Sequence, residues 1–170
     1  RVVRCMNRIT TAALAALIFT TCPMPAASPA DALAGRWTSG RISMIQYQDS
    51  ITGRSAPTNG NAFAYEFHAD GSYTFTGLMQ NVLYHCTTTL FAVESGAYSF
   101  DGRTLSLRPE KNPYKMTNSC APSSNREGPG KLTNRTYEAR IVTGNGGSRL
   151  ELRDEKGQEQ SFAAERKQTP

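Results

Sequence analysis

The chain has 170 residues, of which 38% are hydrophobic and 19% charged, with a formal net charge of +5. This length and composition fit one globular domain and exclude a second domain of ordinary size. The basic residues are dispersed along the sequence instead of forming one stripe, so a nucleic-acid partner is not expected.

The first thirty residues predict an export signal. Arg1, Arg4 and Arg8 precede an apolar run at 12–19, and a stretch of small residues follows at 26–30. A positive start, a short apolar centre and an end rich in small residues are typical of a secretory signal peptide. The apolar run is well short of the roughly 20 residues that a membrane-spanning helix needs.

The expected organisation is a signal peptide over residues 1–30 and a single domain over 31–170, with residues 1–5 an overlong gene start before Met6. Removal of the signal leaves 16 basic and 14 acidic residues, a net charge of +2. The mature protein is then expected to be secreted or periplasmic, with no transmembrane segment. The alternative is a lipid anchor at Cys22, although the preceding Phe-Thr-Thr fits a lipoprotein signal poorly.

The mature sequence alternates with the period of β-strands. In 62–68 the aromatic residues Phe63, Tyr65 and Phe67 fall on one face, and this segment is followed by turn residues at Asp70-Gly71. Tyr73 and Phe75 alternate in the same way beyond the turn, so the sequence predicts a hairpin. The remaining predicted strands lie at 37–47, 83–93, 98–100, 105–107, 137–141, 150–152 and 162–164.

These elements predict an all-β protein, an antiparallel up-and-down barrel of about eight strands. Hairpin follows hairpin, and closure removes exposed sheet edges. The alternative is a β-sandwich of the immunoglobulin type. It is disfavoured because Trp37 lies upstream of Cys86 and Cys120, whereas that fold places its tryptophan between the two cysteines.

Two polar segments, 48–61 and 109–134, are predicted to be long loops. Cys86 and Cys120 are the two cysteines of the mature chain, and export predicts a disulfide between them. It would enclose 33 intervening residues and tie the second loop to the strand that carries Tyr84 and His85.

Three motifs carry a family resemblance. They are Gly35-Arg36-Trp37 at the first strand, the hairpin sequence from Tyr65 to Tyr73 around Asp70-Gly71, and the sequence from Gly96 to Leu107 around Asp101-Gly102. Together they resemble the lipocalin and lipocalin-like barrels, in particular small secreted bacterial members. The resemblance implies a barrel in which Trp37 plugs one end.

The sequence gives little sign of catalysis. The mature chain has two histidines, His68 and His85, and none of the common nucleophile, phosphate or dinucleotide motifs. We therefore expect a non-catalytic protein without cofactor or metal, with a hydrolytic triad through His85 as the weaker alternative.

The expected function is the binding of a small apolar ligand in the barrel. Inward-facing rings would either line such a cavity or fill a narrow core, and the sequence leaves both open. The alternative function is a cell-envelope interaction module or hydrolase inhibitor that acts through loop 109–134. The candidate ligand-binding residues are Tyr65, Phe67, Phe75, Tyr84, His85 and Tyr98.

Overall fold

The computed structural model describes residues 29–42, 47–48, 55–56 and 59–165. The signal peptide and the lipid anchor at Cys22 concern residues outside these ranges. The described elements are α1 (Pro29–Leu33), β1 (Gly35–Ile42), β2 (Tyr47–Gln48), β3 (Ser55–Ala56), β4 (Gly60–Phe67), β5 (Ser72–Leu83), β6 (Cys86–Phe100), β7 (Thr104–Lys111), β8 (Pro113–Asn118), η1 (Pro122–Ser124), β9 (Arg126–Pro129), β10 (Arg135–Gly144), β11 (Gly147–Arg153) and β12 (Glu159–Ala164).

Eight of the described strands form a closed antiparallel barrel. Their order around the barrel is β1, β4, β5, β6, β7, β10, β11 and β12, which is also their order along the chain. β12 closes the barrel on β1, where Ala164 lies opposite Trp37. The predicted up-and-down barrel is confirmed, and β2 and β3 form a separate small sheet.

The barrel interior is filled by the residues that alternation assigned to the inner face. The register places Trp37 opposite Tyr65 on β4, and Tyr65 opposite Phe75 on β5, so large rings follow one another around the wall. Leucines from β7 and β11 fill the other side. The buried hydrophobic cluster consists of Leu33, Trp37, Tyr65, Phe67, Tyr73, Tyr98, Leu105, Leu107, Tyr137, Ala139, Leu150, Leu152 and Phe162.

The short helix α1 closes one end of the barrel. Leu33 on this helix is fully buried, and the indole Nε1 of Trp37 donates a hydrogen bond to its carbonyl oxygen at 2.8 Å. Nearby, the hydroxyl of Tyr98 donates to the carbonyl oxygen of His68 at 3.0 Å. This end therefore holds a packed plug in which the polar atoms of Trp37 and Tyr98 are paired.

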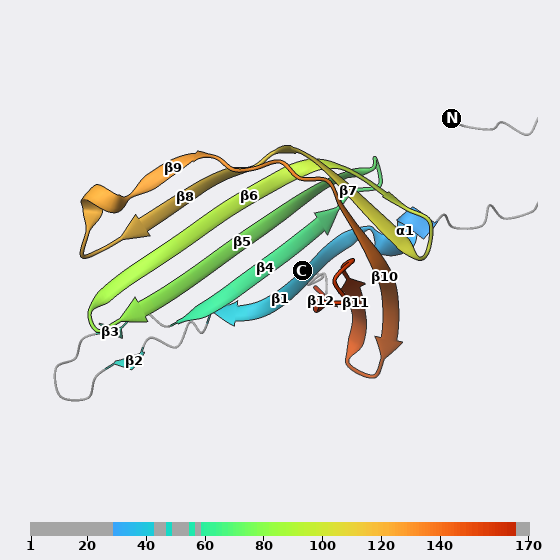
Figure 1. Ribbon diagram of the computed structural model, residues 1–170. Helices are drawn as coiled ribbons and strands as arrows, with labels where there is room; N and C mark the ends of the chain where they lie inside the picture. The colour runs from blue at the N-terminus through green and yellow to red at the C-terminus, as the bar shows by residue number, and fades with distance from the viewer. Residues whose placement is uncertain (1–28, 43–46, 49–54, 57–58, 166–170) are drawn as a thin grey trace, which may run out of the picture.

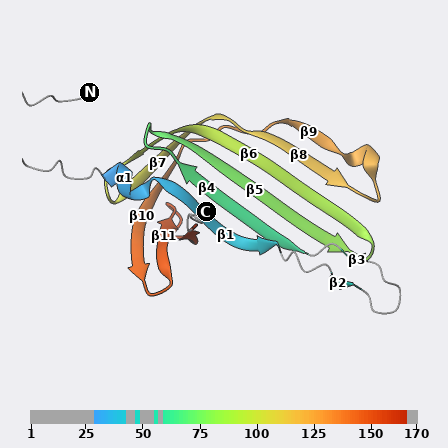
Figure 2. The same ribbon diagram turned by 180° about the vertical axis from the view of Figure 1, so that it is seen from behind.

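At the opposite end, β5 and β6 run on beyond the barrel. β6 pairs with β7 from Ser95 to Phe100, but its earlier part, Thr88–Ala92, pairs with β8 instead. β9 then pairs with β8 and forms the outer edge. Figures 1 and 2 show these strands as a twisted sheet that projects from the barrel on the side away from α1. We call this projecting sheet, residues 60–63, 77–93 and 113–129, the extension.

The predicted loop 109–134 is wrong for most of its length. It contains the end of β7, then β8, η1 and β9. The alternation of a strand is present in Tyr114-Lys115-Met116, with Tyr114 and Met116 on one face of β8 and Lys115 on the other. Prolines at 113 and 122 mask this pattern in the sequence, because proline is expected in a loop and not in a sheet interior.

The predicted strand 83–93 is also wrong at its start. β5 ends at Leu83 and β6 begins at Cys86, so Tyr84 and His85 form a two-residue hairpin turn. Sequence reasoning missed the turn because it contains none of the usual turn residues. Tyr84 adopts a positive φ of 56°, which glycine or asparagine normally provides.

The predicted disulfide between Cys86 and Cys120 is confirmed. It joins the first residue of β6 to the connection between β8 and β9. Two hydrogen bonds of 2.9 Å reinforce this connection, from the Thr87 amide to the Ser119 hydroxyl and from the Ser119 amide to the Thr87 carbonyl. The extension is thus cross-linked at the end where the barrel core does not reach.

Reduction of the disulfide is expected to loosen the extension before the barrel. A bridge across a sequence separation of 34 contributes about 3 to 4 kcal/mol in the chain-entropy model. Native-state hydrogen exchange should therefore show faster exchange of amides in 86–92 and 114–120 after reduction, while amides of β11 keep their protection. Equal acceleration in both regions would contradict a locally acting bridge.

Candidate functional site

Four of the six predicted ligand-binding residues lie together inside the barrel. Tyr65, Phe67 and Tyr98 are buried and Phe75 is half-buried. The ring centroids of Tyr65 and Phe75 are 4.7 Å apart, and those of Phe67 and Tyr98 are 4.9 Å apart. These rings occupy the interior by packing on one another, so the structure places them in a core and not around an open space.

The other two predicted residues, Tyr84 and His85, are not brought to this group. They form the turn at the far end of the extension, where the side chain of Tyr84 is 90% exposed. His68, the other of the two histidines in the chain, is exposed in the turn after β4. The two histidines therefore lie on solvent-exposed turns.

A charged cluster that sequence reasoning missed lies inside the barrel, near the point where β6 leaves it for the extension. Glu94 on β6 is 5% exposed and accepts a hydrogen bond of 2.7 Å from the hydroxyl of Tyr73 on β5. The same carboxylate pairs with the guanidinium of Arg135 on β10, whose side chain is 30% exposed. We call Tyr73, Glu94 and Arg135 the mouth.

In the mouth the charges of Glu94 and Arg135 balance, and one hydrogen-bond donor of Arg135 has no partner among the described residues. Arg135 and Glu94 neutralise each other, but the Nε–H of Arg135 is buried without a hydrogen-bond partner among the described residues. Burial raises the pKa of the Tyr73 hydroxyl, and its hydrogen bond to Glu94 raises it further. Burial likewise raises the pKa of Tyr65, so both phenols stay protonated at physiological pH.

The inner wall of the barrel continues onto one face of the extension. Phe63 and Phe75 stack with centroids 6.1 Å apart, and they lie against Gly77, where an added methyl group would touch both rings at 3.4 Å. Tyr114 of β8 belongs to the same cross-strand row. The next row toward the β5–β6 turn contains Asn61, Met79, Leu90, Met116 and Arg126.

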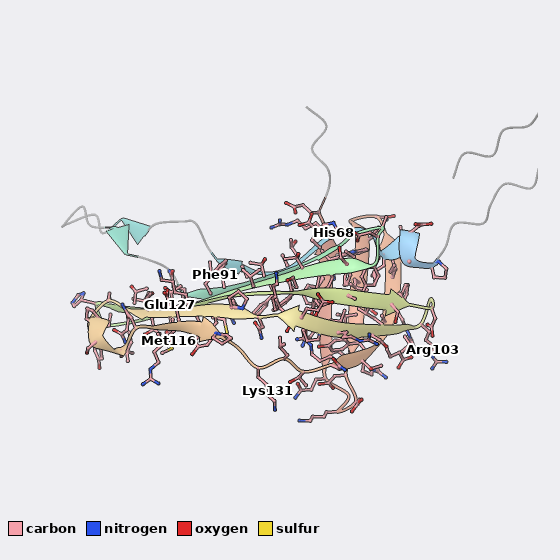
Figure 3. The ribbon with its side chains drawn as sticks, turned by 90° about the horizontal axis from the view of Figure 1, so that it is seen from above. His68, Phe91, Arg103, Met116, Glu127 and Lys131 are labelled. Carbon is pink, nitrogen blue, oxygen red and sulfur yellow. A yellow bond between two sulfur atoms is a disulfide. The ribbon has the colours of Figure 1, made fainter. Side chains whose placement is uncertain are left out.

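Neighbouring residues on these strands point to the opposite face. In Figure 3, Met116 lies on one side of the sheet and Phe91 on the other, as alternation requires. We call the face with Leu90 and Met116 the inner face. Its central residues Met79, Leu90 and Met116 are apolar and only partly buried, with Met79 44% exposed, and the polar Asn61 and Arg126 stand at the two ends of their row.

A sequence signal for the mouth does exist. From 78 to 93 the chain has no Asp, Glu, Lys or Arg, and Glu94 ends this run at a position with the inward parity of Phe75. A charged residue on a buried strand face calls for a partner. The partner could not be identified from the sequence, because Arg135 lies 41 positions away on another strand.

One hollow on the outer surface is less suited to an apolar ligand. It has about 170 Å³, lies over β10, β11 and β12, and is lined mainly by polar and charged side chains. Its arginines are already paired, Arg140 with Glu138 at 3.0 Å and Arg153 with Glu159. This hollow offers no continuous apolar wall.

Among the described residues, no group of three or more His, Cys, Asp and Glu side chains is placed to hold a metal ion. No helix in the described ranges has the length and apolar character to cross a membrane. Comparisons with protein-family models, curated proteins and solved structures return no match to the chain.

Replacement of Glu94 by glutamine is expected to lower the free energy of unfolding by about 1 to 3 kcal/mol, because it leaves a partly buried guanidinium without its counter-charge. Glu159→Gln is the matched control, since it removes the partner of an exposed arginine, where solvent screens the charge. Denaturant unfolding should show a clearly larger loss for Glu94→Gln. Equal losses would contradict a structural role for the buried pair.

Proposed function

We propose that this protein is a non-catalytic binding protein for a small, largely apolar molecule that carries one oxygen acceptor. The apolar part of the ligand lies on the inner face of the extension, and its oxygen lies at the mouth. The observation that carries the proposal is the continuity of the two features. A half-exposed apolar face, including Phe63 and Leu90, runs directly to a buried donor of Arg135 that has no described partner.

The inner face supports the apolar half of this proposal. Met79, Leu90 and Met116 come from three adjacent strands and meet in one cross-strand row. All three remain partly accessible. Covering an apolar side chain of this size stabilises a complex by up to about 1.5 to 3 kcal/mol. A ligand that covers this row would gain the hydrophobic contacts that the fold itself leaves unused.

The mouth supports the polar half. A ligand oxygen that accepts from the Arg135 Nε–H would satisfy a buried donor, which is costly to leave unpaired. Because Glu94 already balances the charge of Arg135, a carboxylate ligand would meet the charge of Glu94 as well. A neutral carbonyl, ester or hydroxyl oxygen fits this environment better.

We further propose that the chain is exported, as the sequence of residues 1–30 predicts. The disulfide between Cys86 and Cys120 supports this location, because such bridges persist mainly in oxidising compartments.

The alternative function, capture of a protein through residues 109–134, finds weaker support. β9 is the outer edge of the described sheet, and an edge strand can pair with another chain. However, β9 spans only Arg126–Pro129 and ends in a residue that lacks a backbone donor. Short, charged and proline-containing edges resist strand addition.

Ligand binding can be tested with prodan, an aromatic ketone whose emission moves to shorter wavelength in apolar surroundings. Wild-type protein is expected to bind it, and Arg135→Lys is expected to weaken binding about five- to tenfold, the effect of one hydrogen bond of about 1 kcal/mol. Lysine keeps the positive charge beside Glu94 but lacks the Nε–H. Fluorescence titration measures the dissociation constant.

The two faces of β6 supply the control. Leu90→Ser removes an apolar side chain from the inner face, and Phe91→Ser removes its neighbour from the opposite face. Leu90→Ser should weaken prodan binding, whereas Phe91→Ser should leave it unchanged. No binding by the wild type, or equal losses in both variants, would refute the proposed site.

A further inference from the structure

The turn between β5 and β6 differs in chemistry from the other described hairpin turns of the barrel. Those turns contain Asp70-Gly71, Asp101-Gly102, Asn145-Gly146 and Asp154 with Gly157. In three of them the aspartate accepts backbone hydrogen bonds, from Ser72 at 2.9 Å, from Thr104 at 2.6 Å and from Lys156 at 2.9 Å. The β5–β6 turn instead consists of Tyr84 and His85.

Tyr84 does not serve the stability of the fold. Among the described non-glycine residues it alone has a positive φ, 56°, a conformation that is unfavourable for a bulky L-residue. With 90% of its side chain exposed, it has almost no packing contacts to offset this cost. Residues held in such conformations are concentrated at functional sites.

Exposed apolar side chains gather around this turn. Of the six large hydrophobic residues that are exposed in the described ranges, four lie on the β5–β6 hairpin: Met79, Leu83, Tyr84 and Phe91. Leu83 directly precedes the turn and is 65% exposed. We call Leu83 and Tyr84 the tip.

Among the described residues, the strand segments that lead to the tip contain no acidic residue. The segments 78–93 and 113–126 have no Asp or Glu, and their charged residues are Lys115 and Arg126, with His85 in the turn. Lys115 pairs with Glu127 at 3.9 Å, while Arg126 forms no ion pair with a described residue. These segments of the extension are therefore weakly basic and carry exposed apolar side chains, although the chain as a whole has 14 acidic residues.

The tip is also held in place. The disulfide begins at Cys86, two residues after Tyr84, and ties this end of β6 to Cys120. Figures 1 and 2 show the hairpin reaching away from the barrel, at the opposite end from α1. The fold thus presents a leucine and a tyrosine on a cross-linked, projecting hairpin.

We propose that the tip docks this protein on a phospholipid surface. Leu83 enters the acyl boundary and Tyr84 lies at the headgroup level, where an aromatic ring with a polar hydroxyl is favoured. Segments 78–93 and 113–126, which lack acidic residues, do not repel anionic lipids, and Arg126 adds a modest attraction. A bilayer fits these observations better than a protein partner, because the tip offers apolar insertion without a fixed pattern of polar contacts. This inference does not depend on the proposed ligand.

The test is co-sedimentation with vesicles of phosphatidylcholine and phosphatidylglycerol. Wild-type protein with its disulfide intact is expected to partition onto the vesicles, and Leu83→Ser to lower the partition coefficient about tenfold, the effect of one exposed leucine that is no longer buried. Tyr84→Gly should also weaken partitioning. Val142→Ser on β10 is the matched control, since Val142 is 47% exposed but lies outside the extension.

A second readout separates docking from misfolding. Because glycine accepts a positive φ, Tyr84→Gly should keep or raise the midpoint of thermal unfolding while it weakens vesicle binding. No partitioning by the wild type, or tip variants that partition like the wild type, would overturn the proposal. An equal loss with Val142→Ser would overturn it as well. The vesicle experiment is independent of the prodan titration, so failure of the proposed ligand site would leave its outcomes unchanged.

Discussion

The structure depends on a mismatch in strand length. β5 has 12 residues and β6 has 15, whereas their barrel neighbours β4 and β7 have 8 each. A closed barrel of this height can bury only part of such a hairpin. The remainder has to leave the barrel, and beyond that point the inner face loses the opposite wall that covers it elsewhere.

Glu94 marks the point where the hairpin leaves the barrel. It is the inward-facing residue of β6 between Ala92, where the pairing with β8 ends, and Ser95, where the pairing with β7 begins. Its pair with Arg135 links β6 to β10 at this point, while the disulfide fastens the far end of the same hairpin. Between these two connections the sheet is held by backbone pairing and by Phe63 and Phe75 packed on Gly77. The apolar residues left on its surface are those from which both proposals start.

The barrel was predictable because local signals agree with the global fold. Alternating rings at Tyr65 and Phe67, followed by Asp70-Gly71, specify a hairpin at any position in a chain, and the same holds for Asp101-Gly102. The turn at Tyr84 and strand β8 were missed where sequence and structure disagree locally: a tyrosine takes a glycine-like φ, and prolines border a strand. The mouth was missed for a different reason, since a contact between residues far apart in sequence depends on register and barrel closure.

The most direct test is solvent paramagnetic relaxation with a soluble gadolinium chelate, measured at side-chain methyl groups in the free protein. The account expects strong relaxation at Met79 and measurable relaxation at Leu90 and Met116, with almost none at Leu105 and Leu150 inside the barrel. If Met79, Leu90 and Met116 were as protected as the core leucines, the inner face would be covered, and the central claim of an open face beyond a filled barrel would be wrong.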